Sequence, residues 1–157
     1  MVNLEKALVK DAKELLNIQK ECFENYSIKY GDFDSNPYHM TLHRMEFNLK
    51  YKFGHYYKVV DFKTETIIGG IFIFELDDPH VMQIAQFYIA EEFRHMGIGK
   101  LVFEAVLEKH TEVKTWYVDT ILEEDHNVNF YKQAGFVELE REVEHEGLSF
   151  VTLIKKR

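Results

Sequence analysis

The stretch EEFRHMGIGKLVFEAVLEKH, residues 91–110, changes character along its length. It opens with charged residues, passes through Gly97-Ile98-Gly99, and continues with apolar residues at helical spacing. The first backbone N–H groups of a helix have no helical partner and carry a partial positive charge. Glycines before such a helix let a phosphate approach the backbone. The stretch therefore predicts a helix whose start binds an anion.

Basic side chains surround these glycines. Arg94, His95 and Lys100 add positive charge there, although 19 basic and 27 acidic residues give the chain a net charge of −8. This local reversal of sign favours a phosphate or pyrophosphate as the ligand. The alternative is that the glycines only shape a turn between a strand and a helix.

Two familiar phosphate loops are excluded by the sequence. In a P-loop the Gly-Lys pair is followed by Ser or Thr, whereas Leu101 follows Lys100, and Arg94 stands where the first P-loop glycine belongs. The dinucleotide fingerprint requires a third glycine, and Val102 occupies that position. The anion site therefore belongs to another class of loop.

Composition limits the possible functions. The 157 residues predict a single domain, 1–157, and 46% hydrophobic residues indicate a globular protein. The single cysteine, Cys22, excludes an intrachain disulfide and fits a reducing compartment. We see no signal peptide and no apolar run of about 20 residues, which predicts a cytoplasmic protein without a membrane partner. The acidic balance disfavours nucleic acid and favours cationic ligands.

The hydrophobic periodicity predicts a mixed α/β fold. We expect strands at residues 3–9, 56–62, 67–76, 81–89, 113–119, 136–142 and 148–154. We expect helices at residues 12–25, 38–49 and 128–133, and one within the quoted stretch 91–110 with the glycines at its start. A capping box is expected at 11–14 and a loop at 31–37. A meander of strands thus runs into a strand–helix–strand unit, whose two strands are parallel if they share a sheet.

Two segments together resemble a known family. Arg94-His95-Met96-Gly97-Ile98-Gly99, after an apolar strand, resembles the acyl-CoA pyrophosphate loop of the GNAT superfamily of N-acetyltransferases, Gln/Arg-x-x-Gly-x-Gly/Ala. The segment NFYKQAGF, residues 129–136, resembles the later helix of the family, with its lysine displaced to Lys132. The resemblance covers residues 67–136, and residues 1–55 resemble the family only in the order of their helices.

The resemblance implies a fold, a co-substrate and partners. It implies an α+β fold with a mostly antiparallel central sheet of about six or seven strands, flanked by about four helices, with parallel splayed strands around the CoA site. The co-substrate is acetyl-CoA, and no metal is expected. The acceptor is a small-molecule amine or a peptide, and a homodimer fits the habit of the family.

The resemblance also assigns residues. The strand before the loop aligns the pantetheine arm through its backbone, and Tyr131 donates a proton to the departing thiolate. The implied cofactor-binding residues are Phe87, Tyr88, Ile89, Arg94, His95, Met96, Gly97, Ile98, Gly99, Lys100, Asn127, Phe130 and Tyr131. Asn127 is a substitute for the asparagine that the family often has where Glu124 stands here, and it can equally cap the short helix.

The general base departs from the pattern of the family. Several members carry an acidic residue on the strand before the loop, but residues 81–86 contain no carboxylate. Gln83 or Gln86 could only orient a water molecule, and Glu75 on the neighbouring strand is an alternative. We therefore predict a water-mediated route, with Tyr131 and Gln83 as the catalytic residues.

Residues 23–57 mix aromatic rings with carboxylates, and in the family this region walls the acceptor site. The rings are Phe23, Tyr26, Tyr30, Phe33, Tyr38, Phe47, Tyr51, Phe53, Tyr56 and Tyr57, and the carboxylates are Glu21, Glu24, Asp32, Asp34 and Glu46. Such a wall suits an ammonium group, whereas the alternative is that most rings pack the helices onto the sheet. His39, His43 and Glu46 share one face of the expected helix, but nothing completes a metal site, so no metal is predicted.

Together these patterns predict an acetyltransferase. It transfers an acetyl group from acetyl-CoA to a primary amine of a cationic acceptor, by direct attack through a tetrahedral intermediate. One alternative is a non-catalytic acyl-CoA-binding or sensing module, and another is an acetyltransferase that acts on a protein N-terminus or lysine. A metal-binding or purely structural domain is a further class.

Overall fold

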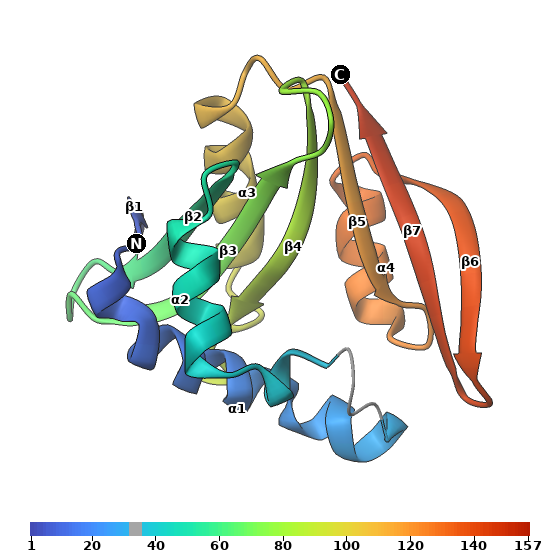
Figure 1. The fold of residues 1–157 in the computed structure, drawn as a ribbon, viewed down its shortest axis with the longest axis horizontal. Helices are drawn as coiled ribbons and strands as arrows, with labels where there is room; N and C mark the ends of the chain where they lie inside the picture. The colour runs from blue at the N-terminus through green and yellow to red at the C-terminus, as the bar shows by residue number, and fades with distance from the viewer. Residues whose placement is uncertain (32–35) are drawn as a thin grey trace. The chain divides into compact units, whose positions relative to one another are not determined.

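The structure of the chain is a computed structural model that describes residues 1–31 and 36–157. The chain divides into two compact units, each considered by itself (Figure 1). The first unit contains Met1–Ile73 and Gln86–Lys109, and the second contains Phe74–Ala85 and His110–Arg157. Within the described residues, no helix is both long and apolar enough to cross a membrane.

Strands and helices follow one another along the chain in the order that the sequence predicts. The strands are β1 (Val2–Lys6), β2 (Gly54–Asp61), β3 (Ile67–Glu75), β4 (Val81–Ile89), β5 (Thr115–Ile121), β6 (Val137–His145) and β7 (Leu148–Lys156). The helices are α1 (Ala12–Tyr30), α2 (Leu42–Lys50), α3 (Ile98–Lys109) and α4 (Asp125–Gln133), with 3-10 turns at Val9–Asp11, Pro37–His39 and Glu91–Phe93.

The seven strands form one mixed sheet with the order β1-β2-β3-β4-β5-β7-β6. β1 pairs with β2, β5 with β7, and β6 with β7, and all these pairs are antiparallel. β4 pairs with β5 in parallel, from Val81↔Thr115 to Ile84↔Val118, with α3 as the crossover helix. This arrangement confirms the predicted mixed, mostly antiparallel sheet and the parallel strand–helix–strand unit.

In the first unit, helices cover both faces of the sheet. α2 lies in front of the strands and α3 behind them (Figure 1). α3 buries Ile98, Val102, Phe103 and Val106, which recur at helical spacing along one side. This buried stripe fixes the rotation of α3, and therefore the direction in which its first turn faces.

The start of α1 differs from the prediction. Asp11 does not cap α1, because its Oδ2 accepts the Leu8 N–H at 2.8 Å and its Oδ1 accepts from Lys58 Nζ at 3.2 Å. The expected capping box at residues 11–14 is therefore wrong, and a 3-10 turn that includes Val9 replaces the end of the expected first strand. α1 also continues past residue 25 and ends where Gly31 adopts a left-handed φ of 61°.

The second expected helix divides into two elements. A 3-10 turn at Pro37–His39 precedes α2, and Thr41 begins α2 by accepting the Arg44 N–H at 3.1 Å. Residues 32–35, within the predicted loop, lie outside the described residues. The other element boundaries shift by a few residues without changing the type of element.

Candidate active site

The end of β4 is held by a buried pair of tyrosines in the first unit. The hydroxyl groups of Tyr56 and Tyr88 share a hydrogen bond of 2.6 Å, and both side chains are buried. Gly69 and Gly70 on β3 make room for this arrangement. A Cβ at Gly69 would collide with the Tyr88 carbonyl oxygen, and one at Gly70 would lie 2.7 Å from the Tyr88 hydroxyl. The Tyr88 side chain therefore belongs to the core, and Tyr88 can serve a ligand only through its backbone.

The last residue of β4 connects the strand to the loop. The Ile89 carbonyl oxygen accepts from Arg94 Nε at 2.9 Å and from Cys22 Sγ at 3.4 Å. Burial raises the pKa of the Cys22 thiol, and Arg94 acts in the opposite direction. Cys22 is therefore a neutral packing and hydrogen-bonding residue. Beyond Ile89 and the Cys22 thiol, the guanidinium group of Arg94 has no hydrogen-bond partner among the described residues.

The loop after β4 has the backbone conformation that its glycines predict. His95 has a φ of 62° and Gly97 a φ of 77°. A Cβ at Gly97 would meet no described atom within 4 Å. Glycine is therefore favoured at this position by its backbone conformation and by the open space beside it, not by crowding.

The first turn of α3 presents unused backbone donors. Its first backbone hydrogen bond runs from the Leu101 N–H to the Gly97 carbonyl, at 3.2 Å. The N–H groups of Gly97, Ile98, Gly99 and Lys100 form no hydrogen bond within residues 1–31 and 36–157. These donors, the helix dipole and the outer end of the Arg94 guanidinium suit a phosphate group. The residues present therefore fit the pyrophosphate of acetyl-CoA.

Tyr131 lies on α4 in the second unit. Its ring meets Phe130 edge-on at 5.1 Å and Phe136 at 5.4 Å between centroids. Gly135, with a φ of 99°, turns the chain so that Phe136 follows directly. Burial raises the pKa of the Tyr131 hydroxyl above its ordinary value, so the group stays protonated at neutral pH. Within the described residues, this hydroxyl forms no hydrogen bond, which leaves it available as a donor.

Gln83 and Asn127 also belong to the second unit. Gln83 pairs with Tyr117 across the β4–β5 ladder, and its Nε2 makes one long contact of 3.4 Å to the Ile84 carbonyl. Asn127 lies inside the first turn of α4, and Glu124 occupies the N-cap position. The capping role considered for Asn127 is therefore wrong, because the helix starts earlier than the sequence pattern indicates.

A carboxylate that the sequence pattern did not single out lies on β5. Asp119 is the first β5 residue beyond the last parallel pair, Ile84↔Val118. Its Oδ1 accepts from Thr152 Oγ1 at 2.5 Å. Aspartate is disfavoured in the middle of a strand. That local misfit, VDT within an otherwise β-favouring segment, is the signal that could have identified Asp119.

The aromatic region of the first unit differs from the expected acceptor wall. Tyr30 and Tyr56 are buried core residues, as the packing alternative predicts. Tyr30 and four further rings already carry one of the chain's own cations within 6.0 Å of the centroid: Lys29 over Tyr30, Lys20 over Tyr38, Arg44 over Phe47, Lys52 over Phe53 and Lys109 over Tyr57. These ring faces do not support the binding of a substrate ammonium. Asp32, Phe33 and Asp34 lie outside the described residues.

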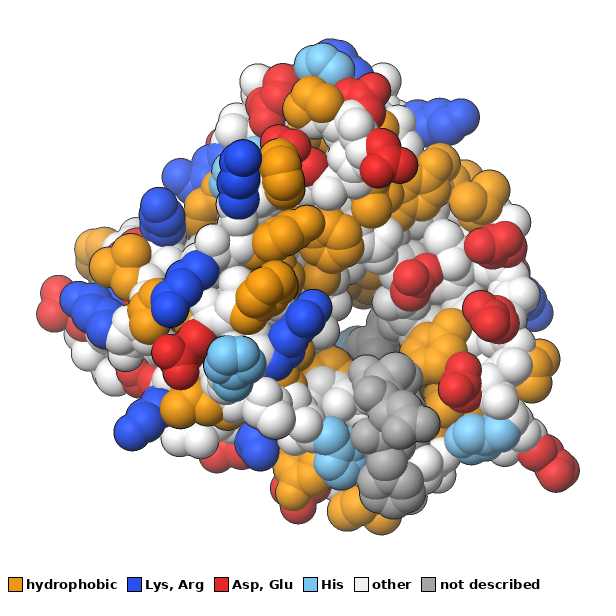
Figure 2. Space-filling view, in the orientation of Figure 1, with side chains coloured by type: hydrophobic (Ala, Val, Ile, Leu, Met, Phe, Trp, Pro, Cys, Tyr) orange, Lys and Arg blue, Asp and Glu red, His pale blue; other side chains and the backbone are white. Residues whose placement is uncertain are grey.

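The outer side of α2 carries an open pocket of about 420 Å³. Figure 2 shows Lys and Arg side chains among hydrophobic ones over this helix. The pocket is lined by His43, Glu46, Phe47, Lys50, Tyr51 and Lys52. With two lysines and one glutamate, this lining is unsuited to a cation.

The histidines considered as metal ligands do not share a helix face. His39 belongs to the 3-10 turn before α2, and its Nε2 lies 2.7 Å from Ser27 Oγ. His43 belongs to α2. Among residues 1–31 and 36–157, no three His, Cys, Asp or Glu side chains gather closely enough to hold a metal ion.

Comparisons with known proteins agree with this geometry. Among solved structures, a ribosomal protein alanine N-acetyltransferase from Escherichia coli superposes with a TM-score of 0.80 at 8% identity, covering 99% of this chain and 94% of its own. A spermidine N-acetyltransferase chimera from Vibrio cholerae and hSSAT superposes with a TM-score of 0.77 at 18% identity, covering 99% of this chain and 95% of its own. An IAA acetyltransferase from Bacillus cereus superposes with a TM-score of 0.72 at 16% identity, covering 100% of both chains.

These identities are low, so the superpositions establish the fold alone. A search of curated protein sequences gave no significant match. The profile of the family described as "Acetyltransferase (GNAT) family", however, matches residues 12–136, which include β4, the loop, α3 and the segment around Tyr131. The chain belongs to the GNAT family of acetyltransferases.

Proposed function

We propose that residues 1–157 form one N-acetyltransferase domain, which transfers an acetyl group from acetyl-CoA to a primary amine. The observation that carries this proposal is the run of unused N–H groups from Gly97 to Lys100, which follows Arg94 in the loop and helix start after β4. An acetyl-CoA pyrophosphate would accept from these donors. The membership of the family supplies the reaction type, and members of this family use acetyl-CoA as co-substrate.

Each described group has a task in this reaction. Arg94 and the loop bind and orient the pyrophosphate, and the backbone of Phe87, Tyr88 and Ile89 aligns the pantetheine arm. The amine attacks the thioester carbonyl directly and forms a tetrahedral intermediate. The neutral Tyr131 hydroxyl protonates the departing sulfur, since burial holds this group in its acid form. Gln83 orients a water molecule near the amine.

The acceptor we propose is a cationic amine. The support is the net charge of −8, which raises the local concentration of cations. The names of the superposed structures include different acceptors, spermidine in one and a ribosomal protein in another, and so the fold does not select among them. A protein N-terminus or lysine therefore belongs in the same test as small amines.

Incubation of the purified protein with acetyl-CoA and a panel of amines tests the proposal. The panel contains a polyamine, an aminoglycoside, a basic peptide and an anionic amino acid, and mass spectrometry measures the acetylated product. We expect one or more cationic amines to gain an acetyl group. Acetyl-CoA binding without turnover of any amine would indicate the non-catalytic binding module instead.

A further inference from the structure

Asp119 occupies a defined position in the sheet of the second unit. The β4–β5 ladder ends at Ile84↔Val118, and Asp119 is the next residue of β5. It pairs with Thr152 on β7, and Thr152 in turn pairs with Glu140 on β6. The three side chains therefore form one row across the strands, with Asp119 at the end nearest to β4.

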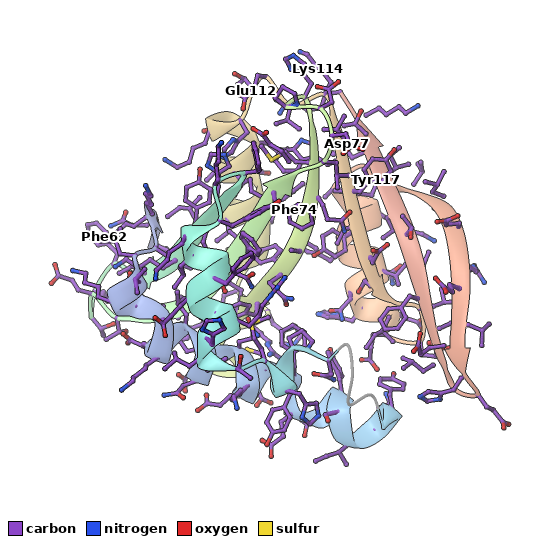
Figure 3. The ribbon with its side chains drawn as sticks, in the orientation of Figure 1. Phe62, Phe74, Asp77, Glu112, Lys114 and Tyr117 are labelled. Carbon is purple, nitrogen blue, oxygen red and sulfur yellow. The ribbon has the colours of Figure 1, made fainter. Side chains whose placement is uncertain are left out.

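The row lies on the open side of these strands. Trp116 and Val118 are buried, at 0% and 3% exposure, on the side of β5 that α4 covers. Because side chains alternate along a strand, Tyr117 and Asp119 point to the other side. Tyr117 is labelled on β5 in Figure 3. Asp119 is exposed, whereas Thr152 beside it is half-buried.

The carboxylate of Asp119 is oriented yet available. Thr152 Oγ1 donates to Oδ1 at 2.5 Å, which fixes the direction of the carboxylate. Its other oxygen forms no hydrogen bond within the described part of the chain. An ammonium group that reaches this side of β5 therefore meets an acceptor oxygen held in place by a neighbouring strand.

We propose that Asp119 is the group that receives the proton of the acceptor ammonium, with Thr152 as its positioning residue. This inference rests on the proposed acetyl transfer and supplies the base that β4 lacks. It replaces the water-mediated route through Gln83 as the first step. Gln83, opposite Tyr117 in the adjacent ladder, then faces the same side of the strands as Asp119.

The proposed acetyl transfer is balanced in atoms, protons and electrons. One ammonium N–H bond breaks, and its proton passes to the free Asp119 oxygen and on to water. The nitrogen lone pair forms the bond to the acetyl carbon, the C–S bond breaks, and its electron pair leaves on sulfur. Sulfur takes the proton of Tyr131, and the second nitrogen proton restores Tyr131 through water. The net products are an amide, a thiol and one released proton.

Other titratable groups face this side of the strands. Tyr117 comes from β5, Glu140 and Glu142 come from β6, and Lys156, which pairs with Thr115, comes from β7. The other β7 residues that pair with β5 on this side, Phe150, Thr152 and Ile154, carry no charge. Figure 2 shows acidic side chains over the region of β6 and β7. Because Glu140 shares the row with Asp119 but does not border β4, Glu140→Gln is the matched control for charge alone.

Three variants test the assignment with the full-length chain, acetyl-CoA and the best amine of the panel. Asp119→Asn keeps the shape and the Thr152 hydrogen bond but cannot take the proton. We expect kcat/KM for the amine to fall about 100-fold at neutral pH, and the deficit to shrink as pH approaches the pKa of the amine, which then arrives deprotonated. Thr152→Val should cost several-fold in kcat, and Glu140→Gln should cost about 2-fold or less.

The outcomes separate this inference from the proposed function. The acetyl-CoA-induced rise in Tm should be the same in all three variants, because none touches the phosphate loop. A wild-type protein that transfers no acetyl group would overturn the proposed function. An active wild type with an Asp119→Asn variant that matches Glu140→Gln, or that loses the same factor at every pH, would overturn the role of Asp119 alone.

Discussion

The phosphate loop and the row at Asp119 are built in opposite ways. The loop is continuous in sequence, and its donors are the backbone N–H groups from Gly97 to Lys100. The row joins Asp119 and Thr152, which lie 33 positions apart and meet through strand register. The first region is thus specified locally, and the second by pairing of distant strands. Changes in the loop should affect acetyl-CoA binding, whereas changes near Asp119 and Tyr131 should affect turnover.

The largest expected effect is the loss of acetyl-CoA binding in Gly97→Asp. The aspartate would place a negative charge and a side chain beside the unused N–H groups, where the pyrophosphate should bind. A ligand that binds only the folded state raises Tm by mass action. We therefore expect acetyl-CoA to raise the Tm of the wild type and to leave that of Gly97→Asp unchanged.

Two variants control for the altered backbone. Gly147 has a φ of 87°, and a Cβ added there, as at Gly97, would meet no described atom within 4 Å. Gly147→Asp introduces the same change in the β6–β7 turn and should keep the full Tm shift. Gly97→Asn separates charge from bulk and should retain part of it. A full shift in Gly97→Asp would place the cofactor elsewhere.

The same contrast explains what could be predicted from the sequence. The loop was predictable because glycines, basic residues and a helical pattern are adjacent in the chain. Asp119 was missed because its partner depends on the β5–β7 register, which no local pattern specifies. The capping box at Asp11 failed for a related reason, since Lys58 on β2 and the Leu8 N–H compete for its carboxylate.

The order of elements was predicted well, and their ends less so. The apolar periodicity of α3 and the alternation in the strands survive in the structure, because burial enforces them. α1 extends to Tyr30 because Tyr30 itself is buried, a tertiary contact that the pattern up to residue 25 does not contain. The sequence pattern equally did not reveal the cations over Tyr38, Phe47 and Phe53, although they decide what these rings can bind.

The next largest effect should come from Tyr131→Phe, which removes only the hydroxyl group. We expect kcat to fall about 100-fold, in line with a lost general acid, while the acetyl-CoA-induced Tm shift stays unchanged. Because burial raises the pKa of Tyr131, the wild type should keep its proton donor from about pH 7 to 10. Measured kcat and Tm values test both parts, and a wild-type kcat with a good acceptor would remove Tyr131 from the mechanism.

Replacement of Arg94 should give a smaller effect, and it should change KM for acetyl-CoA rather than kcat. Arg94→Ala loses both the Nε–Ile89 hydrogen bond and the outer end of the guanidinium. We expect KM for acetyl-CoA to rise about 10-fold with little change in kcat, because one charge-assisted contact of several is lost. Arg94→Lys keeps the positive charge but loses the planar guanidinium group, so its KM for acetyl-CoA should lie between those of the wild type and Arg94→Ala. Steady-state kinetics with varied acetyl-CoA measure both constants. A fall in kcat with an unchanged KM would contradict the assignment of the loop to acetyl-CoA binding.

The smallest expected effect concerns the charge of the acceptor. A primary alkylamine is mostly protonated at neutral pH, like lysine with its pKa near 10.4. It would approach a protein of net charge −8 as a cation, so its encounter should be favoured by the long-range field and weakened by salt. We expect kcat/KM for polyamines or basic peptides to exceed that for anionic amino acids, to rise with pH, and to fall several-fold between about 0.05 and 0.5 M salt. The control is KM for acetyl-CoA, measured at the same two salt concentrations, because the phosphate loop carries positive charge and its own salt response must be subtracted. A preference for an anionic acceptor that persists at high salt would show that the overall negative charge does not select the acceptor, because a long-range field is screened by salt.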